Sequence, residues 1–150
     1  MTVRTGAAGL IAAALLPMTA LAAGTEVSDA WAPAGGKSGG EAPLYMTVVN
    51  GDSKADTLTR VRCPVSFATE QRQTDRGEGA PSSRAIKSVS IPANSTLKFE
   101  QGGYYVALVQ LKEPLKEGDS FTCSMTFGSG GPKQVPVKVG AMQAAPETEK

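Results

Sequence analysis

The sequence predicts an all-β, single-domain protein that folds as a small sandwich, and two features of the chain indicate this class. Turn residues recur at short intervals, as at residues 50–52, 102–103 and 117–119. The runs between such turns are short and rich in Val, Thr, Tyr and Phe, a rhythm typical of β-sandwiches and barrels. No long segment shows the 3.6-residue period of an amphipathic helix.

The clearest expected strand covers residues 120–127, where apolar and hydroxyl-bearing residues alternate strictly. Strict alternation indicates a strand with one face in the core and one face toward solvent. The face expected to point inward consists of Phe121, Cys123, Met125 and Phe127. Residues 104–111 are instead apolar on both faces, which predicts a central strand covered on both sides.

The remaining expected strands are shorter or less regular. They cover residues 27–31, 44–50, 59–63, 65–71, 85–90, 96–100 and 134–139. Pro136 favours an edge position for the last of these, because proline cannot donate a ladder hydrogen bond. Residues 32–43 and 72–83 are expected to be loops, and residues 140–150 a disordered tail.

The amino-terminal segment has the three parts of a secretory signal peptide. Arg4 is followed by an apolar run at 10–16 and by the small-residue stretch Ala20-Leu21-Ala22-Ala23. The apolar run is shorter than the roughly 20 residues that a membrane-spanning helix needs. We therefore expect cleavage after Ala22 or Ala23, which divides the chain into a signal peptide (1–23), one domain (24–139) and the tail.

This segment sets the expected compartment as periplasmic or secreted, with no membrane insertion after cleavage. No cysteine stands at the cleavage site, so a lipid anchor is not expected. The chain has 15 basic and 14 acidic residues, and removal of Arg4 leaves 14 of each. Because no basic stripe is available to contact phosphates, nucleic acid is not an expected partner.

Besides its methionines, the chain contains two sulfur-bearing residues, Cys63 and Cys123. In an oxidising compartment an even pair indicates a disulfide. Both are expected to point inward from strands that are distant in sequence, so the bridge is expected to join them across the core. Free thiols that act as metal ligands are the alternative interpretation.

The chain contains no histidine, which removes the commonest general base and metal ligand. Ser-His-Asp, Cys-His and histidine-metal sites are therefore impossible. The glycine-rich stretch 35–40 lacks the spacing and the strand-to-helix setting of a phosphate-binding loop. An enzyme is not expected.

Residues 102–119, which read GGYYVALVQLKEPLKEGD, resemble the signature G-G-Y-H-V-M-L-M-x-L-K-x-P-L-K-x-G-D of the periplasmic copper chaperone family often written PCu(A)C. Further similar stretches at 27–31, 44–50, 91–93 and 126–127 follow the family's order. The resemblance implies a cupredoxin-like Greek-key β-sandwich with mostly antiparallel strands.

The resemblance also implies four copper-ligand positions, which this chain fills with other residues. The family uses a histidine, a methionine after ten intervening residues, a histidine after twenty-one more, and a methionine two positions later. The corresponding positions here are Arg72, Ser83, Tyr105 and Ala107. Cu(I) prefers thioether, thiolate or imidazole donors, so the family's usual site is expected to be lost and no cofactor is expected there.

Two functions remain open at this point. The first is an exported copper-chaperone-like binding or accessory protein, linked to periplasmic copper handling or oxidase copper-site assembly, with a periplasmic protein as its partner. In this interpretation Tyr104, Tyr105 and the arginines of 72–84 form the contact surface. The second is a working copper carrier with a non-standard sulfur site made of Cys63, Cys123 and Met125.

Overall fold

The computed structural model describes residues 24–75, 77, 79 and 82–141. These residues form strands joined by turns, and they contain no helix long and apolar enough to cross a membrane. The expected signal peptide (1–23) and residues 142–150 of the expected tail lie outside the described residues. The strands are β1 (Thr25–Pro33), β2 (Ala42–Asn50), β3 (Asp56–Arg62), β4 (Ser66–Asp75), β5 (Ser82–Ile86), β6 (Val89–Ile91), β7 (Ser95–Phe99), β8 (Tyr104–Leu111), β9 (Ser120–Phe127) and β10 (Pro132–Gly140).

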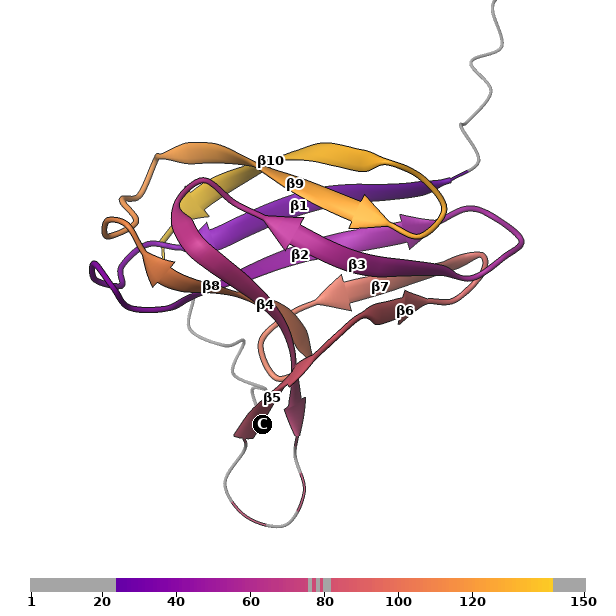
Figure 1. Ribbon diagram of the computed structural model, residues 1–150, viewed down its shortest axis with the longest axis horizontal. Helices are drawn as coiled ribbons and strands as arrows, with labels where there is room; N and C mark the ends of the chain where they lie inside the picture. The colour runs from indigo at the N-terminus through magenta and orange to yellow at the C-terminus, as the bar shows by residue number, and fades with distance from the viewer. Residues whose placement is uncertain (1–23, 76, 78, 80–81, 142–150) are drawn as a thin grey trace, which may run out of the picture.

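The strands form one continuous mixed sheet in the order β5-β4-β8-β7-β2-β1-β10-β9-β3-β6. Among the described strands, β1 with β10 and β7 with β8 pair in parallel, and the other pairings are antiparallel. The sheet curves back on itself, so the expected layers face each other within a barrel-like body (Figure 1). The all-β class predicted from the sequence is confirmed.

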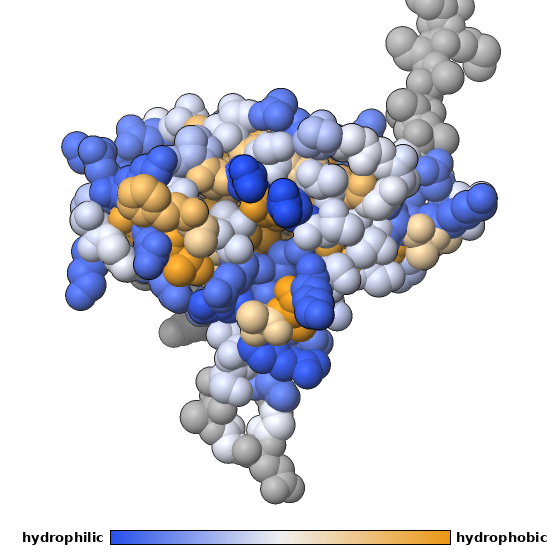
Figure 2. All heavy atoms as spheres, viewed as in Figure 1, coloured by the Kyte–Doolittle hydropathy of each residue, from blue (hydrophilic) through white to orange (hydrophobic). Residues whose placement is uncertain are grey.

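The core fills the interior of this body with alternating side chains. On β9 the inward residues Cys123, Met125 and Phe127 are almost completely buried, as the alternation predicted. Strand β8 lies between β4 and β7 and also pairs with β2, and its middle residues Val106, Ala107 and Leu108 are buried. The central position predicted for residues 104–111 is therefore confirmed, but the strand is not covered on both sides as predicted, since Tyr104, Tyr105 and Val109 are only partly buried. The outer surface over β3 and β9 is mostly hydrophilic, with apolar side chains in small groups (Figure 2).

The predicted loop 72–83 is wrong. Residues 71–75 of β4 pair with residues 82–86 of β5, from Gln71↔Ile86 to Asp75↔Ser82, and this hairpin projects from the body (Figure 1). The segment is mostly polar on both faces, so the sequence shows no alternation there. Its backbone is nevertheless extended, because β4 pairs with β8 on one side and with β5 on the other. The loop prediction for 32–43 is also too long, since β1 reaches Pro33 and β2 begins at Ala42.

The strand predicted at 85–90 is divided in two. Strand β5 pairs with β4, whereas β6 pairs with β3, so the chain must turn between Ile86 and Val89 to move from one neighbour to the other. The side-chain amide of Gln71 donates a hydrogen bond to the carbonyl of Lys87 at 3.3 Å and supports this turn.

The edge position predicted for the strand with Pro136 is also wrong, because β10 lies between β1 and β9. Pro136 is tolerated there because the ladder to β1 begins only at Trp31↔Lys138, beyond the proline. Strand β10 also includes Gly140, which the sequence analysis assigned to the tail.

The predicted disulfide joins Cys63 and Cys123, with the two Cα atoms 4.4 Å apart and both side chains buried. It does not cross the core as expected. The pairing Arg62↔Ser124 places Cys63, just after β3, opposite Cys123 on the neighbouring strand β9. Distance in sequence, here 60 residues, was a poor guide to distance between strands.

A buried carboxylate joins the ends of several strands. Asp56, only 5% exposed, accepts hydrogen bonds from the Ser129 hydroxyl (2.6 Å), the backbone N–H groups of Ser129 (3.0 Å) and Thr57 (2.8 Å), and the Thr25 hydroxyl. Burial by itself would raise the pKa of Asp56, but these hydrogen bonds outweigh it and hold the pKa below its usual value.

Candidate functional site

The four positions taken from the family signature lie on three neighbouring strands. Tyr105 and Ala107 are two residues apart on β8, so their side chains leave the same face. Arg72 on β4 is the register partner of Tyr105. Ser83 on β5 is paired with Thr74, two residues from Arg72, so it lies on the same face of the hairpin.

An open cleft of about 760 Å³ lies between the β4–β5 hairpin and the starts of β2 and β8. Three of the four positions, Ser83, Tyr105 and Ala107, contribute to its wall. Arg72 reaches the same wall indirectly, because it is ion-paired with Glu41. The lining residues are Glu41, Ala42, Pro43, Tyr45, Thr74, Gly79, Ser82, Ser83, Gln101, Gly102, Tyr105 and Ala107.

Arg72 is held by two carboxylates. Its Nη1 and Nη2 atoms donate to the two oxygens of Glu41 at 2.9 and 3.1 Å, and its Nε and Nη2 atoms donate to Glu70 Oε2 at 3.0 and 2.8 Å. The hydrogen bonds that Arg72 donates to Glu41, and then to Glu70, raise the pKa of Arg72, and they outweigh its partial burial, which lowers that pKa. The guanidinium is therefore permanently charged, and the three groups together carry one net negative charge.

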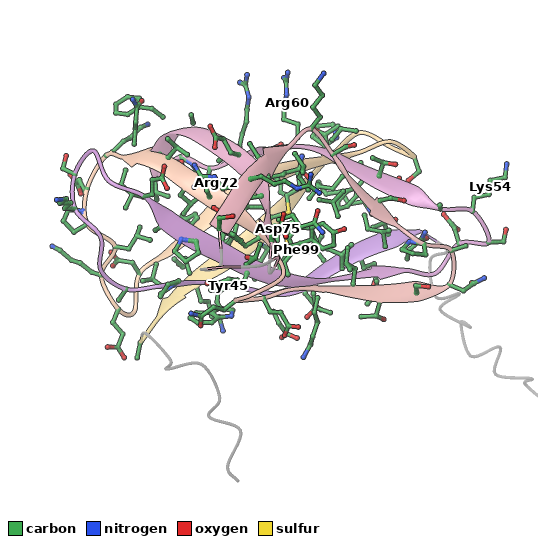
Figure 3. The ribbon with its side chains drawn as sticks, turned by 90° about the horizontal axis from the view of Figure 1, so that it is seen from below. Tyr45, Lys54, Arg60, Arg72, Asp75 and Phe99 are labelled. Atoms are coloured by element: carbon green, nitrogen blue, oxygen red, sulfur yellow. A yellow bond between two sulfur atoms is a disulfide. The ribbon has the colours of Figure 1, made fainter. Side chains whose placement is uncertain are left out.

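Aromatic side chains continue the site beyond Tyr105. Tyr45 lines the cleft, and its ring centroid lies 5.3 Å from that of Trp31 on β1. Partial burial, and then the neighbouring Tyr105 hydroxyl, raise the pKa of Tyr45. The basic side chain of Arg60 lies on the opposite side of the body from Tyr45 and is remote from this site (Figure 3).

Sequence reasoning missed Glu41, Glu70, Tyr45 and Trp31 as parts of this site. Trp31 and Tyr45 were expected only as strand residues, and Glu41 lay in a predicted loop. Their outward direction follows from the alternation of β1 and β2, but their proximity to Tyr105 follows from strand pairing. That pairing joins residues up to 66 positions apart, as at Ala42↔Leu108, and it leaves no local pattern in the chain.

The chemistry of this site is that of hydrogen bonding and stacking. Its side chains provide hydroxyls, an ion-paired guanidinium, aromatic rings and a methyl group, and none of the soft donors that Cu(I) prefers. Among the described residues, no group of three or more His, Cys, Asp or Glu side chains is placed to hold a metal ion.

Comparison with known proteins places the chain in a family. Residues 25–139 match the family described as "Putative lipoprotein LpqE-like". The chain belongs to the LpqE-like family. A relative from Leifsonia xyli subsp. xyli, described as "Putative lipoprotein Lxx21020", is 32% identical over 118 residues, which cover 77% of this chain and 70% of that protein.

Solved structures similar to this LpqE-like chain include PCuAC domains. The copper-bound PCuAC domain from PmoF2 has a TM-score of 0.64 at 21% identity, covering 78% of this chain and 92% of that domain. The apo form of DR1885 from Deinococcus radiodurans has a TM-score of 0.60 at 26% identity and covers 94% of each chain. A Cu(I) form of DR1885 is also similar, with a TM-score of 0.60 at 21% identity. The LpqE-like chain thus shares the fold of these domains.

Proposed function

We propose that this protein is an exported, copper-chaperone-like binding or accessory protein whose family copper site is lost. One observation carries the proposal: Arg72, at the first ligand position of the family signature, is a permanent cation already held by Glu41 and Glu70. Supporting it, the neighbouring positions hold Ser83, Tyr105 and Ala107, which are hard donors or no donor at all.

The guanidinium matters because it opposes a metal ion at this place. A guanidinium has no lone pair to donate to Cu(I), and Glu41 and Glu70 hold the Arg72 side chain at this position. The ion pairs themselves contribute modestly to stability, because Glu41 and Glu70 side chains are 52% and 45% exposed. The arrangement is therefore better suited to contacting a partner than to holding a metal.

The location and finer fold belong to the same proposal. We infer a periplasmic or secreted protein with a cupredoxin-like Greek-key arrangement, no catalytic activity and a periplasmic protein partner. The signal-peptide pattern at residues 1–23 and the description of the relative as a lipoprotein favour export. The similarity to PCuAC domains favours the Greek-key arrangement and a role in periplasmic copper handling or oxidase copper-site assembly.

The alternative function is a copper carrier that uses the sulfur atoms of Cys63, Cys123 and Met125. Cys123 and Met125 leave the same inward face of β9. Both cysteine sulfurs are engaged in the disulfide, and Cys123 and Met125 are fully buried. This function therefore requires reduction of the bond and a change in the core.

Cu(I) titration of the purified protein, in competition with bicinchoninate, tests the proposal. We expect no tight binding by the oxidised protein. We expect tight binding after the fourfold change Arg72→His, Ser83→Met, Tyr105→His and Ala107→Met, which restores the family's ligands. A threefold variant that keeps Arg72 serves as the control and should remain weak.

Two results would decide against parts of this account. Tight binding by the unmodified oxidised protein would refute the lost site. Tight binding only after reduction, abolished by Cys63→Ser, would favour the sulfur site instead.

A further inference from the structure

The outer face of the sheet carries a continuous row of side chains across five strands. The register pairs Lys138 with Trp31, Trp31 with Tyr45, and Tyr105 with Arg72. The β2–β8 ladder ends at Leu44↔Val106, so Tyr45 comes opposite Tyr105 one step farther. Directly opposed residues leave the same face of a sheet. We call Trp31, Tyr45 and Tyr105 the aromatic row; Lys138 and Arg72 flank its two ends.

The rings of Trp31 and Tyr45 pack against each other, and all three side chains of the aromatic row stay partly exposed to solvent. Each of the three residues is only partly buried, whereas their sequence neighbours Ala30, Leu44 and Val106 lie in the core. The rings of Trp31 and Tyr45 are tilted by 46° relative to each other, so they form ridges and not a flat plate. Each ring also has an N–H or O–H donor at its edge.

Ridges of Trp and Tyr with edge donors suit a polyproline II segment. This left-handed helix makes no internal hydrogen bonds, so its carbonyl groups accept from such donors, and its prolines fit between aromatic rings. Pro43, beside the row in the cleft, adds a further apolar surface. A segment already fixed in this conformation also loses little entropy on binding.

The length of the row sets the length of its ligand. Four steps between neighbouring strands, at about 4.8 Å each, separate Lys138 from Arg72 by roughly 19 Å along the surface. A polyproline II helix rises about 3.1 Å per residue, so about six residues span the same distance.

The charges at the two ends differ and indicate the ends of the ligand. At one end Glu41, Glu70 and Arg72 sum to one negative charge, while at the other end Lys138 is exposed and positive.

We propose that the aromatic row is the docking site for a proline-rich segment of a partner protein, about six residues long. A basic side chain of the segment lies at the Arg72 end and an acidic side chain at the Lys138 end. This inference names the partner chemistry of the binding protein proposed above and rests on that proposal, but the lost copper site does not depend on it.

The test uses a capped six-residue peptide of one arginine, four prolines and one glutamate, in that order, added to the oxidised, isotope-labelled protein. We expect saturable NMR shifts at the Trp31 indole and at the backbone of Tyr45 and Tyr105. Tyr45→Ser and Tyr105→Ser should each weaken binding by about tenfold or more, as for aromatic anchors at interfaces. Phe67→Ser is the matched control, because Phe67 is 73% exposed but lies outside the row, and its binding should match the parent protein.

Further peptides and a sedimentation measurement complete the test. A peptide with glycine and serine in place of the prolines, and the same end charges, should bind at least about tenfold more weakly. The proposal would be overturned if both peptides bound equally well or if no peptide bound at all. It would also be overturned if both tyrosine variants, with NMR spectra that show a native fold, bound the proline peptide as tightly as the parent protein. A concentration-dependent dimer that buries Trp31 would overturn it too, by naming a second copy as the occupant. None of these results depends on Cu(I) binding, so the copper titration tests the proposed function separately.

Discussion

The disulfide between Cys63 and Cys123 offers the sharpest test of what holds this fold together. Its 60-residue separation closes a loop that includes β4 to β8 and so limits the unfolded chain strongly. The chain-entropy relation gives about 4 kcal/mol for a loop of this length. We expect the double change Cys63→Ala and Cys123→Ala to lower the free energy of unfolding by about 4–5 kcal/mol, because small cavities add to the entropic loss.

Urea denaturation followed by Trp31 fluorescence measures this loss. For a domain of about 115 residues, 1 kcal/mol corresponds to roughly 4 °C, so the melting temperature in a thermal scan should fall by about 16–20 °C. The reduced parent protein is the matched control, because it keeps the sulfur volume and loses only the bond. A loss below about 1 kcal/mol in both proteins would refute the reasoning, since it would mean that the loop costs little entropy to close.

Three further predictions follow from individual side chains. Asp56→Asn should destabilise the protein by about 2–3 kcal/mol at pH 7 by urea denaturation. Because the folded pKa of Asp56 is lowered, its contribution is complete above the unfolded pKa of about 3.9 and is lost as pH falls through the folded pKa; a variant with the parent's acid dependence would contradict this. Phe127→Ala, in the core, should cost about 3–5 kcal/mol, whereas Phe67→Ala, at an exposed position, should change stability by less than about 0.5 kcal/mol, and equal losses would contradict the burial. Glu41→Gln should cost at most about 1 kcal/mol because Glu41 is half exposed, and a larger loss would show that its pairing with Arg72 is a main support of the fold.

Local patterns were sufficient where a strand separates the core from solvent. The alternation of 120–127 gave the bounds of β9 and the direction of Cys123, because burial on one face leaves a period of two in the sequence. The hairpin of β4 and β5 was missed because it extends beyond the core, where no side chain needs to be apolar. Pro136 was misjudged because the tolerance of a proline depends on where the neighbouring ladder begins, a property of two chain segments and not of one.

The candidate site shows the same limit. The signature spacing led to Arg72, Ser83, Tyr105 and Ala107, and the structure places them around one cleft; that they correspond to copper-ligand positions stays a prediction. The partners of Arg72 could not be found in this way, because Glu41 is 31 residues away and meets it only through the pairing of β2, β8 and β4.

The parallel pairing of β1 with β10 has a consequence for how the chain acquires its structure. A chain that leaves a ribosome or a translocation channel amino end first presents β1 long before β10. Residues 31–33 of β1 can complete their ladder only when residues 138–140 have emerged, and β2 alone covers the other side of β1 meanwhile. Contacts between such distant segments slow folding. The edge of β1 that faces β10 therefore stays open and accessible to chaperones or proteases until synthesis or transport is almost finished.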